Sequence, residues 1–308
     1  MVGYDPLNEP FPGNPTRDIA NLMPGHFDKN YLAPMYAKIF EKYQNHDSTK
    51  QMWFEPVPFP DFYPVFGGEV FSVGFTTPPG GEIGSNRHAL NDHTYCCQMS
   101  GDECTTGEPK VEDADKCLSF HEKRIGTRAA DAERLGVPLI ITEFGACLTE
   151  GPCSQEINQV AQVADENLVG WAYWEFKTYK DLTTSAGTGS EGFYNNDGSL
   201  QAYKVKALAR PYMQYTQGVL QSMNYDSTSN AFNATFTLGS TTGSSVAYLS
   251  EEYYYTSGID FTITVDGADV SAETASATYA DNFLTFTLDQ SFTAGSTVTL
   301  QVTPKATI

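Results

Sequence analysis

The sequence is poor in basic residues and has no long apolar segments. Of its 308 residues, 18 are Lys or Arg and 38 are Asp or Glu, so the formal net charge at pH 7 is −20. A chain of this charge repels a phosphate backbone, which argues against a nucleic-acid partner. The apolar runs fall far short of the ~18–20 residues that a membrane-spanning helix needs. Aromatic residues make up 13% of the chain, enough to build a packed core.

The N-terminus lacks a basic segment followed by an apolar one, so no signal peptide is visible. Cysteine is confined to the stretch from Cys96 to Cys153, which holds all six. An even, clustered set predicts disulfides and an oxidising compartment. Metal ligation is less favoured, because no C-x-x-C pair occurs and neither His93 nor His121 falls at a zinc-finger spacing.

The disulfide pattern is only partly readable from the sequence. Cys147 and Cys153 are close enough to close a small loop. For the others, either Cys96 or Cys97 can pair with Cys104 or Cys117, and the spacing does not choose between them.

Residues 1–213 alternate short apolar runs with helical stretches. The apolar runs predict strands near residues 2–4, 51–57, 89–97, 138–145 and 168–176. Helices are expected at 34–45, at 112–135 ending before Gly136, from an N-cap at Ser154, and at 200–212. This order predicts a parallel sheet covered by helices, with functional residues at the carboxyl ends of the strands.

Residues 214–308 change to a period of two. Apolar residues alternate with polar ones at 232–238, 261–265, 284–288 and 298–302, between clusters of Ser, Thr and Gly. This pattern predicts a second domain that is a small antiparallel β-sandwich, without chemistry of its own.

Two carboxylates follow predicted strands in a recognisable order. Glu9 lies in an N-E-P motif at 8–10, Glu143 lies in I-T-E-F-G at 141–145, and an aromatic run G-W-A-Y-W-E-F follows at 170–176. With G-Y-D-P-L-N-E-P-F-P-G-N at 3–14, W-F-E-P at 53–56 and H-T-Y-C at 93–96, the chain resembles glycoside hydrolase family 5, and within it the endoglycoceramidase-like branch. The resemblance implies the last five strands, 4 to 8, of a (β/α)8 TIM barrel, followed by the family's C-terminal β-sandwich.

The resemblance also implies a retaining glycosidase mechanism. Glu9 corresponds to the acid/base that protonates the leaving oxygen, and Glu143 to the nucleophile that forms a glycosyl-enzyme. The chemistry requires neither a cofactor nor a metal ion.

Four further residues are implied to bind the substrate. Asn8 would bond the sugar 2-hydroxyl, Tyr95 would orient Glu143, and His93 would line the same rim. Trp174 would form the stacking floor for the sugar, with a place in the barrel core as the alternative. Glu55 is expected to have a structural role, and an acid that hydrogen-bonds to the active-site residues is the alternative.

The expected substrate is a glycosphingolipid. A glucosylceramide, a steryl glucoside or a polysaccharide β-glucoside is the alternative, and a protein that only binds glycan or lipid surfaces is a third. The aromatic-rich segment 59–75 is expected to form a lipid-facing lip that contacts a membrane surface, with packing inside the protein as the alternative.

The match begins inside strand 4 of the barrel. We therefore expect the sequence to be part of a longer secreted enzyme of the extracellular space or of a lysosomal or phagosomal lumen. Such a barrel leaves strand edges unpaired, so we expect this chain alone to aggregate or to show no measurable hydrolysis.

Overall fold

The structure is a computed structural model, and it describes residues 2–61, 69–96, 110–177, 189–239, 242–271 and 273–306. Backbone contacts divide the chain into two compact units, Met1–Gln201 and Ala202–Ile308. The domain boundary predicted at 213/214 stays a prediction, and α5 lies between the two positions.

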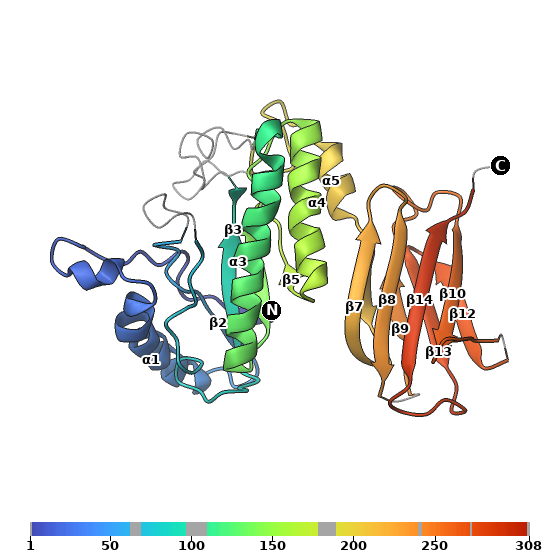
Figure 1. Ribbon diagram of the computed structural model, residues 1–308, viewed down its shortest axis with the longest axis horizontal. Helices are drawn as coiled ribbons and strands as arrows, with labels where there is room; N and C mark the ends of the chain where they lie inside the picture. Colours follow the sequence, from blue (N-terminus) through green and yellow to red (C-terminus); the bar gives the residue numbers. More distant parts are fainter. Residues whose placement is uncertain are drawn as a thin grey trace. The chain divides into compact units, whose positions relative to one another are not determined.

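The first unit is built on a five-stranded parallel sheet in the order β1-β2-β3-β4-β5 (Figure 1). Its strands are Gly3–Tyr4, Gln51–Phe54, His88–Thr94, Leu139–Phe144 and Gly170–Trp171. Each strand pairs with the next one along the chain, and every pairing is parallel. Repeated crossovers in one direction curl such a sheet into part of a (β/α)8 barrel. The predicted partial barrel of five strands is therefore confirmed.

Three long helices accompany this sheet: α1 (Ala33–Gln44), α3 (Ala114–Leu135) and α4 (Glu150–Glu166). α3 packs on β3 and β4, and α4 packs on α3 and β5. Short helical turns lie at Ile19–Leu22, Asp28–Leu32 and Val111–Asp113. α3 ends at Gly136 as predicted, because its φ of 65° is the left-handed conformation that glycine adopts without strain.

Two helix predictions were wrong in their bounds. Ser154 does not cap α4, since the helix begins four residues earlier at Glu150 after Thr149. The helix expected at 200–212 is the shorter α5 (Ala202–Leu208), and Tyr212 already begins strand β6. The proline at 211 has no amide hydrogen, so it favours an early end of the helix.

The side of β3 that faces α3 is held by buried charges. Asp92 accepts hydrogen bonds from Arg124 Nη2 and Arg128 Nε, both at 2.6 Å. The same two guanidinium groups also bind Asp61, which follows β2. All four side chains are buried, so their charges depend on ion pairs and hydrogen bonds within the protein.

Two further links continue along the same pair of elements. Thr94 Oγ1 lies 2.7 Å from Nδ1 of His121, whose Nε2 lies 2.8 Å from Glu156 Oε1 on α4. Cys96 forms a disulfide with Cys117. Asp92 and Thr94 point to one side because side chains alternate along a strand, Cys96 follows just after the strand, and the α3 partners of all three recur every three to four residues. These contacts attach the C-terminal end of β3 to α3.

The second unit is an antiparallel β-sandwich, as predicted. One sheet has the order β11-β10-β14-β8-β7 and the other the order β12-β13-β9-β6 (Figure 1). The strands are Tyr212–Tyr215, Gly218–Asp226, Ala231–Leu238, Ser245–Tyr248, Ile259–Val265, Ala268–Asp269, Ala275–Ala280, Phe283–Leu288 and Thr297–Pro304. The alternating apolar residues at 232–238, 284–288 and 298–302 form its buried core.

The expectation of an exposed aromatic lip at 59–75 is wrong for Val73 and Phe75. Val73 and Phe75 are buried, and the Phe75 ring packs edge-on against Phe54 of β2 at 5.1 Å between centroids. Asp131 of α3 accepts a hydrogen bond from the amide of Val73 at 2.9 Å. Residues 62–68 of the segment lie outside the described residues.

Replacing Arg124 by Ala should destabilise the first unit by about 3–5 kcal/mol, because Asp92 and Asp61 would lose a buried partner. Its neighbour Lys123 is 49% exposed and pairs weakly with Glu69, so Lys123→Ala should cost less than about 1 kcal/mol. All three Trp residues precede position 202, so urea unfolding followed by Trp fluorescence reports on this unit. Equal losses in the two variants would contradict the structural role given to the buried cluster.

Candidate active site

The candidate site forms where the carboxyl ends of β1, β2, β3 and β4 meet. The pairing of β3 with β4 shifts by one residue between Asp92 and His93, so that His93 lies opposite Glu143. Such a bulge re-aims side chains at the end of a sheet. His93 alternates with Asp92 and Thr94, and so it lies on the face of β3 that is turned away from α3, while Tyr95 follows the strand and contacts Glu143.

Glu9 follows β1 and has an unusual backbone conformation. Its φ is 41°, in the left-handed region that non-glycine residues rarely adopt. Its amide N–H donates to Glu55 Oε2 at 2.8 Å. Its side chain is 41% exposed, and Oε1 lies 2.9 Å from His93 Nδ1. The carboxyl group of Glu9 is therefore fixed by its contact with His93 while it stays accessible to solvent.

One imidazole nitrogen joins three carboxyl groups. Nδ1 of His93 lies 2.9 Å from Glu9, 3.4 Å from Glu143 and 3.7 Å from Glu55. One oxygen each of Glu9 and Glu143, and one ring nitrogen of His93, all lie within 4.8 Å of one another. The two acids predicted from the sequence thus approach each other, with one oxygen of each within 4.8 Å.

The carboxylate of Glu143 is partly desolvated, with 13% of the side chain exposed. Burial raises its pKa, while the charge of His93 and the hydrogen bond from Tyr95 act in the opposite direction. Tyr95 donates to Oε2 at 2.9 Å, and burial together with the charge of Glu143 keeps the pKa of Tyr95 well above its ordinary value. Tyr95 therefore remains a hydrogen-bond donor over the whole working pH range.

Burial and neighbouring charges shift the pKa values of Glu55 and His93, which lie next to Glu9 and Glu143. Burial raises the pKa of Glu55 to about 8, although the nearby charge of His93 lowers it. Burial alone would lower the pKa of His93, but its hydrogen bond to Glu9 and the charges of Glu55, Glu143 and Glu9 raise it to about 9. His93 is therefore a cation at neutral pH.

Trp174 lies beside the acids. It packs against Tyr95 and Ala146, and its backbone N–H donates to Phe144 O at 3.1 Å. Its indole Nε1 donates to Glu191 Oε2 at 3.4 Å. The ring is half-buried, so one part is fixed by protein contacts and another part remains accessible.

The other predicted residue is placed less specifically. Asn8 adjoins Glu9 and is exposed, and the hydrogen bonds that link Glu9, His93 and Glu143 among the described residues do not include it. Glu55 and Glu191 are close to the acids; a supporting role for Glu55 was only the less favoured alternative, and Glu191 was not predicted at all. The signal for Glu55 was its place in W-F-E-P after a strand, whereas Glu191 lies in no recognisable motif.

The disulfides close to this rim agree with the sequence. Cys147 is bonded to Cys153, as expected, and Cys96 takes Cys117 rather than Cys104. Cys97 and Cys104 lie outside the described residues.

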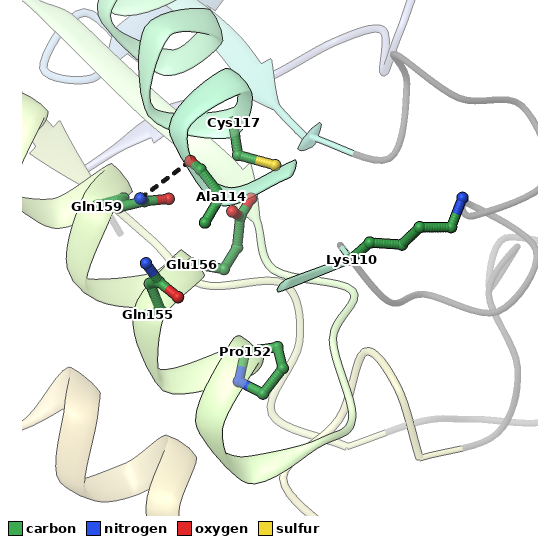
Figure 2. A pocket seen from close by; sticks show the side chains of 7 residues that line it. All are labelled: Lys110, Ala114, Cys117, Pro152, Gln155, Glu156 and Gln159. Atoms are coloured by element: carbon green, nitrogen blue, oxygen red, sulfur yellow. Dashed lines mark hydrogen bonds between the residues drawn. The ribbon is translucent and has the colours of Figure 1, made fainter. Parts of the chain in front are cut away.

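A small hollow lies on the other side of β3, between the N-terminal parts of α3 and α4. Figure 2 shows Cys117 and Glu156 close together in it, with Gln159 Nε2 donating to Ala114 O at 3.1 Å. Its lining residues are Lys110, Ala114, Cys117, Pro152, Gln155, Glu156 and Gln159. Sulfur and carboxylate atoms of Cys96, Cys117 and Glu156 are close enough for one metal ion, but both sulfurs are joined in the disulfide. The hollow holds none of the predicted site residues.

Two family models match the chain. The model described as cellulase (glycosyl hydrolase family 5) matches residues 1–180, and that of the glycoside hydrolase family 5 C-terminal domain matches residues 210–302.

Curated relatives match over most of this chain. An endoglycoceramidase of Cyanea nozakii is 24% identical over 99% of this chain and 54% of its own length. Endoglycoceramidase I of Rhodococcus hoagii is 27% identical over 88% of this chain and 49% of its own length. The chain thus spans about half the length of these relatives.

Solved structures share the fold. Endo-glycoceramidase II from Rhodococcus sp., in complex with a five-membered iminocyclitol, superimposes with a TM-score of 0.67 at 24% identity, covering 99% of this chain and 60% of that one. Sterylglucosidase 1 of Cryptococcus neoformans gives a TM-score of 0.65 at 10% identity over 91% of this chain and 45% of its own. Within the described residues, no helix is both long and apolar enough to traverse a lipid bilayer.

The protonation of the site predicts a stability that falls as pH rises. Folding raises the pKa of Glu55 from 4.5 to about 8, so folded protein keeps a proton that unfolded protein loses across that interval. The same holds for His93 between pH 6.5 and about 9. The midpoint of thermal unfolding, followed by Trp fluorescence, should drop by several degrees from pH 5 to pH 9.

The variant Glu55→Gln provides the matched control. It cannot titrate, so its unfolding midpoint should fall less steeply than that of the wild type between pH 4.5 and pH 8. Identical profiles would show that Glu55 has no raised pKa in the folded chain.

Proposed function

The chain belongs to glycosyl hydrolase family 5, and on that premise we propose that it is a retaining β-glycosidase whose substrates are glycosphingolipids. The observation that carries the proposal is the approach of Glu9 and Glu143, with carboxylate oxygens within 4.8 Å of each other. Retaining glycosidases need two carboxyl groups about 5–5.5 Å apart, whereas inverting ones leave room for a water molecule between them.

In the first step Glu143 is the nucleophile. Tyr95 donates a hydrogen bond to Oε2 of Glu143, and Nδ1 of His93 lies 3.4 Å from the same oxygen. We therefore assign the attack to the other carboxylate oxygen, Oε1. As the new bond to the anomeric carbon forms, the glycosidic bond breaks and its oxygen takes the proton of Glu9. The exposed carboxyl group of Glu9 suits this role, because the leaving group must depart toward solvent.

In the second step Glu9 acts as a base. Its carboxylate takes a proton from water, the water oxygen bonds the anomeric carbon, and the ester bond to Glu143 breaks. The two inversions together retain the configuration of the sugar. The His93 cation, 2.9 Å from Glu9, stabilises the ionised form of Glu9 that acts as the base in this step.

Trp174 and Asn8 are proposed to bind the sugar. The half-buried indole beside Tyr95 suits stacking against a C–H face of the sugar. Asn8 is exposed next to Glu9, where its amide can reach a hydroxyl group.

A lipid aglycone is supported by the surface next to Glu9. Phe11, Ile19 and Met23, in the segment that follows β1, are large apolar side chains with most of their surface exposed. The relatives named as endoglycoceramidases, and the structure of a related enzyme with ganglioside GM3, point to the same substrate class. We therefore propose a glycolipid at a membrane surface, in the extracellular space or a lysosomal or phagosomal lumen.

Covalent trapping tests this function without requiring steady-state turnover, and labelling followed by release would contradict the expectation that this chain alone shows no hydrolysis. A dinitrophenyl 2-deoxy-2-fluoro-β-glucoside should add one sugar to the intact chain, and peptide mass spectrometry should locate it on Glu143. Glu143→Gln should not be labelled. Glu9→Gln should be labelled, because this leaving group needs no proton, but should release the sugar about 100-fold more slowly or worse.

An exposed acid on α3 supplies the control. Glu133→Gln should be labelled and released like the wild type. Absence of label on wild-type protein, or label on another residue, would overturn the proposed function. Product analysis with a glycosphingolipid then separates release of a whole oligosaccharide from removal of single glucose units.

A further inference from the structure

Glu55 contacts both parts of the proposed acid/base. It follows β2, is 1% exposed, and accepts the amide N–H of Glu9 on Oε2 at 2.8 Å. Its other oxygen lies 3.7 Å from Nδ1 of His93, the nitrogen that also contacts the Glu9 carboxyl group at 2.9 Å. Glu55 thus contacts the backbone of Glu9 directly, and it is linked to the Glu9 side chain through the imidazole of His93.

The backbone of Glu9 needs such support. A φ of 41° is disfavoured for any residue with a side chain, and it persists only where surrounding contacts impose it. The hydrogen bond from Glu9 N–H to a buried acceptor is a contact of this kind. Without it, the residue is expected to relax toward negative φ, which would swing its carboxyl group away from Glu143.

Glu55 is itself held from behind. The hydroxyl group of Tyr36, on α1, donates to Glu55 O at 3.2 Å and accepts from Glu55 N–H at 3.4 Å. Tyr36 is fully buried, so it anchors the acceptor to the helix layer.

Resting on the proposed function, we propose that Glu55 is a positioning residue that holds the general acid/base Glu9 in its left-handed conformation by accepting its amide hydrogen bond. It acts as an acceptor and not as a charge. The groups that act on it are Asp92, Asp5, the imidazole of His93 and the amide of Glu9. Burial and the charges of Asp92 and Asp5 disfavour its ionisation, while His93 and the Glu9 amide favour it, and a neutral carboxyl group still offers a carbonyl oxygen to Glu9 N–H.

If Glu55 acts as a hydrogen-bond acceptor, two substitutions at this position should have different effects. Glu55→Gln keeps an oxygen of the same reach, whereas Glu55→Leu leaves the Glu9 amide unpaired. Both variants should be labelled on Glu143 by the activated fluoroglycoside, because that step needs no proton from Glu9. Release of the sugar to water needs Glu9 as a base, so Glu55→Leu should slow release by about 10–100-fold, while Glu55→Gln stays within about threefold of the wild type.

Added azide identifies the step that is affected. Azide attacks the glycosyl-enzyme without a base, so it should restore release in Glu55→Leu to near the wild-type rate. A purely structural defect would not be rescued. Tyr36→Phe removes the hydroxyl group that anchors Glu55, so it should slow the release of the sugar to a smaller extent, and azide should restore the rate. This variant tests the inference if Glu55→Leu does not fold.

Three results would overturn the inference. These are release from Glu55→Leu at the wild-type rate, failure of azide to rescue it, or equal loss in Glu55→Gln and Glu55→Leu. If wild-type protein is not labelled at all, the proposed function fails instead. Hydrogen exchange then tests the inference alone, because the Glu9 amide should be protected in the wild type and Glu55→Gln and unprotected in Glu55→Leu.

Discussion

Carboxyl groups cannot gather in a partly desolvated site unless something offsets their repulsion, and here His93 provides the offset. Its Nδ1 lies within 3.7 Å of Glu9, Glu55 and Glu143. In a medium of low dielectric, like charges at such distances strongly disfavour joint ionisation. A proton on the imidazole lets one acid remain ionised while another keeps its proton. That difference in protonation is what a pair of catalytic carboxyl groups needs.

The position of His93 depends in turn on the opposite side of its strand. Asp92 and Thr94 flank it in sequence and bind Arg124, Arg128 and His121 on α3. Arg124 Nε also donates to the carbonyl oxygen of His93 at 3.2 Å. One face of β3 therefore binds the helix layer, and the other face carries the groups that meet the acids. The geometry of the site is fixed by contacts that never touch the substrate.

The sequence predicted the elements of the fold well, and the reason is the strength of the periodic signal. All five parallel strands were located; β2 and β4 are mainly apolar, as buried parallel strands usually are, whereas β3 is buried but largely polar. The sandwich was located from its strict alternation at 232–238 and 284–288. The start of α4 was missed because Ser154 is a good capping residue in sequence, while the helix gains a further turn from packing that propensity does not describe.

The candidate site was predictable where a motif carried it, and less so elsewhere. Glu9, Glu143, His93 and Tyr95 do come together, as the motifs implied. The role of Glu55 was not predictable, because it depends on a backbone torsion at Glu9, and a torsion has no signature in composition or spacing. The buried charges of α3 were also missed, because its inward face mixes apolar residues such as Phe120 and Ile125 with His121, Arg124, Arg128 and Asp131.

The disulfide between Cys96 and Cys117 has a consequence for the integrity of the chain. It joins the end of β3 to the first turns of α3, so the intervening 97–116 segment is closed into a covalent ring. A protease that cuts any one peptide bond within this ring opens it without releasing a fragment. The half that carries Glu9 and His93 would stay tethered to the half that carries Glu143, and such nicked molecules would separate only after reduction.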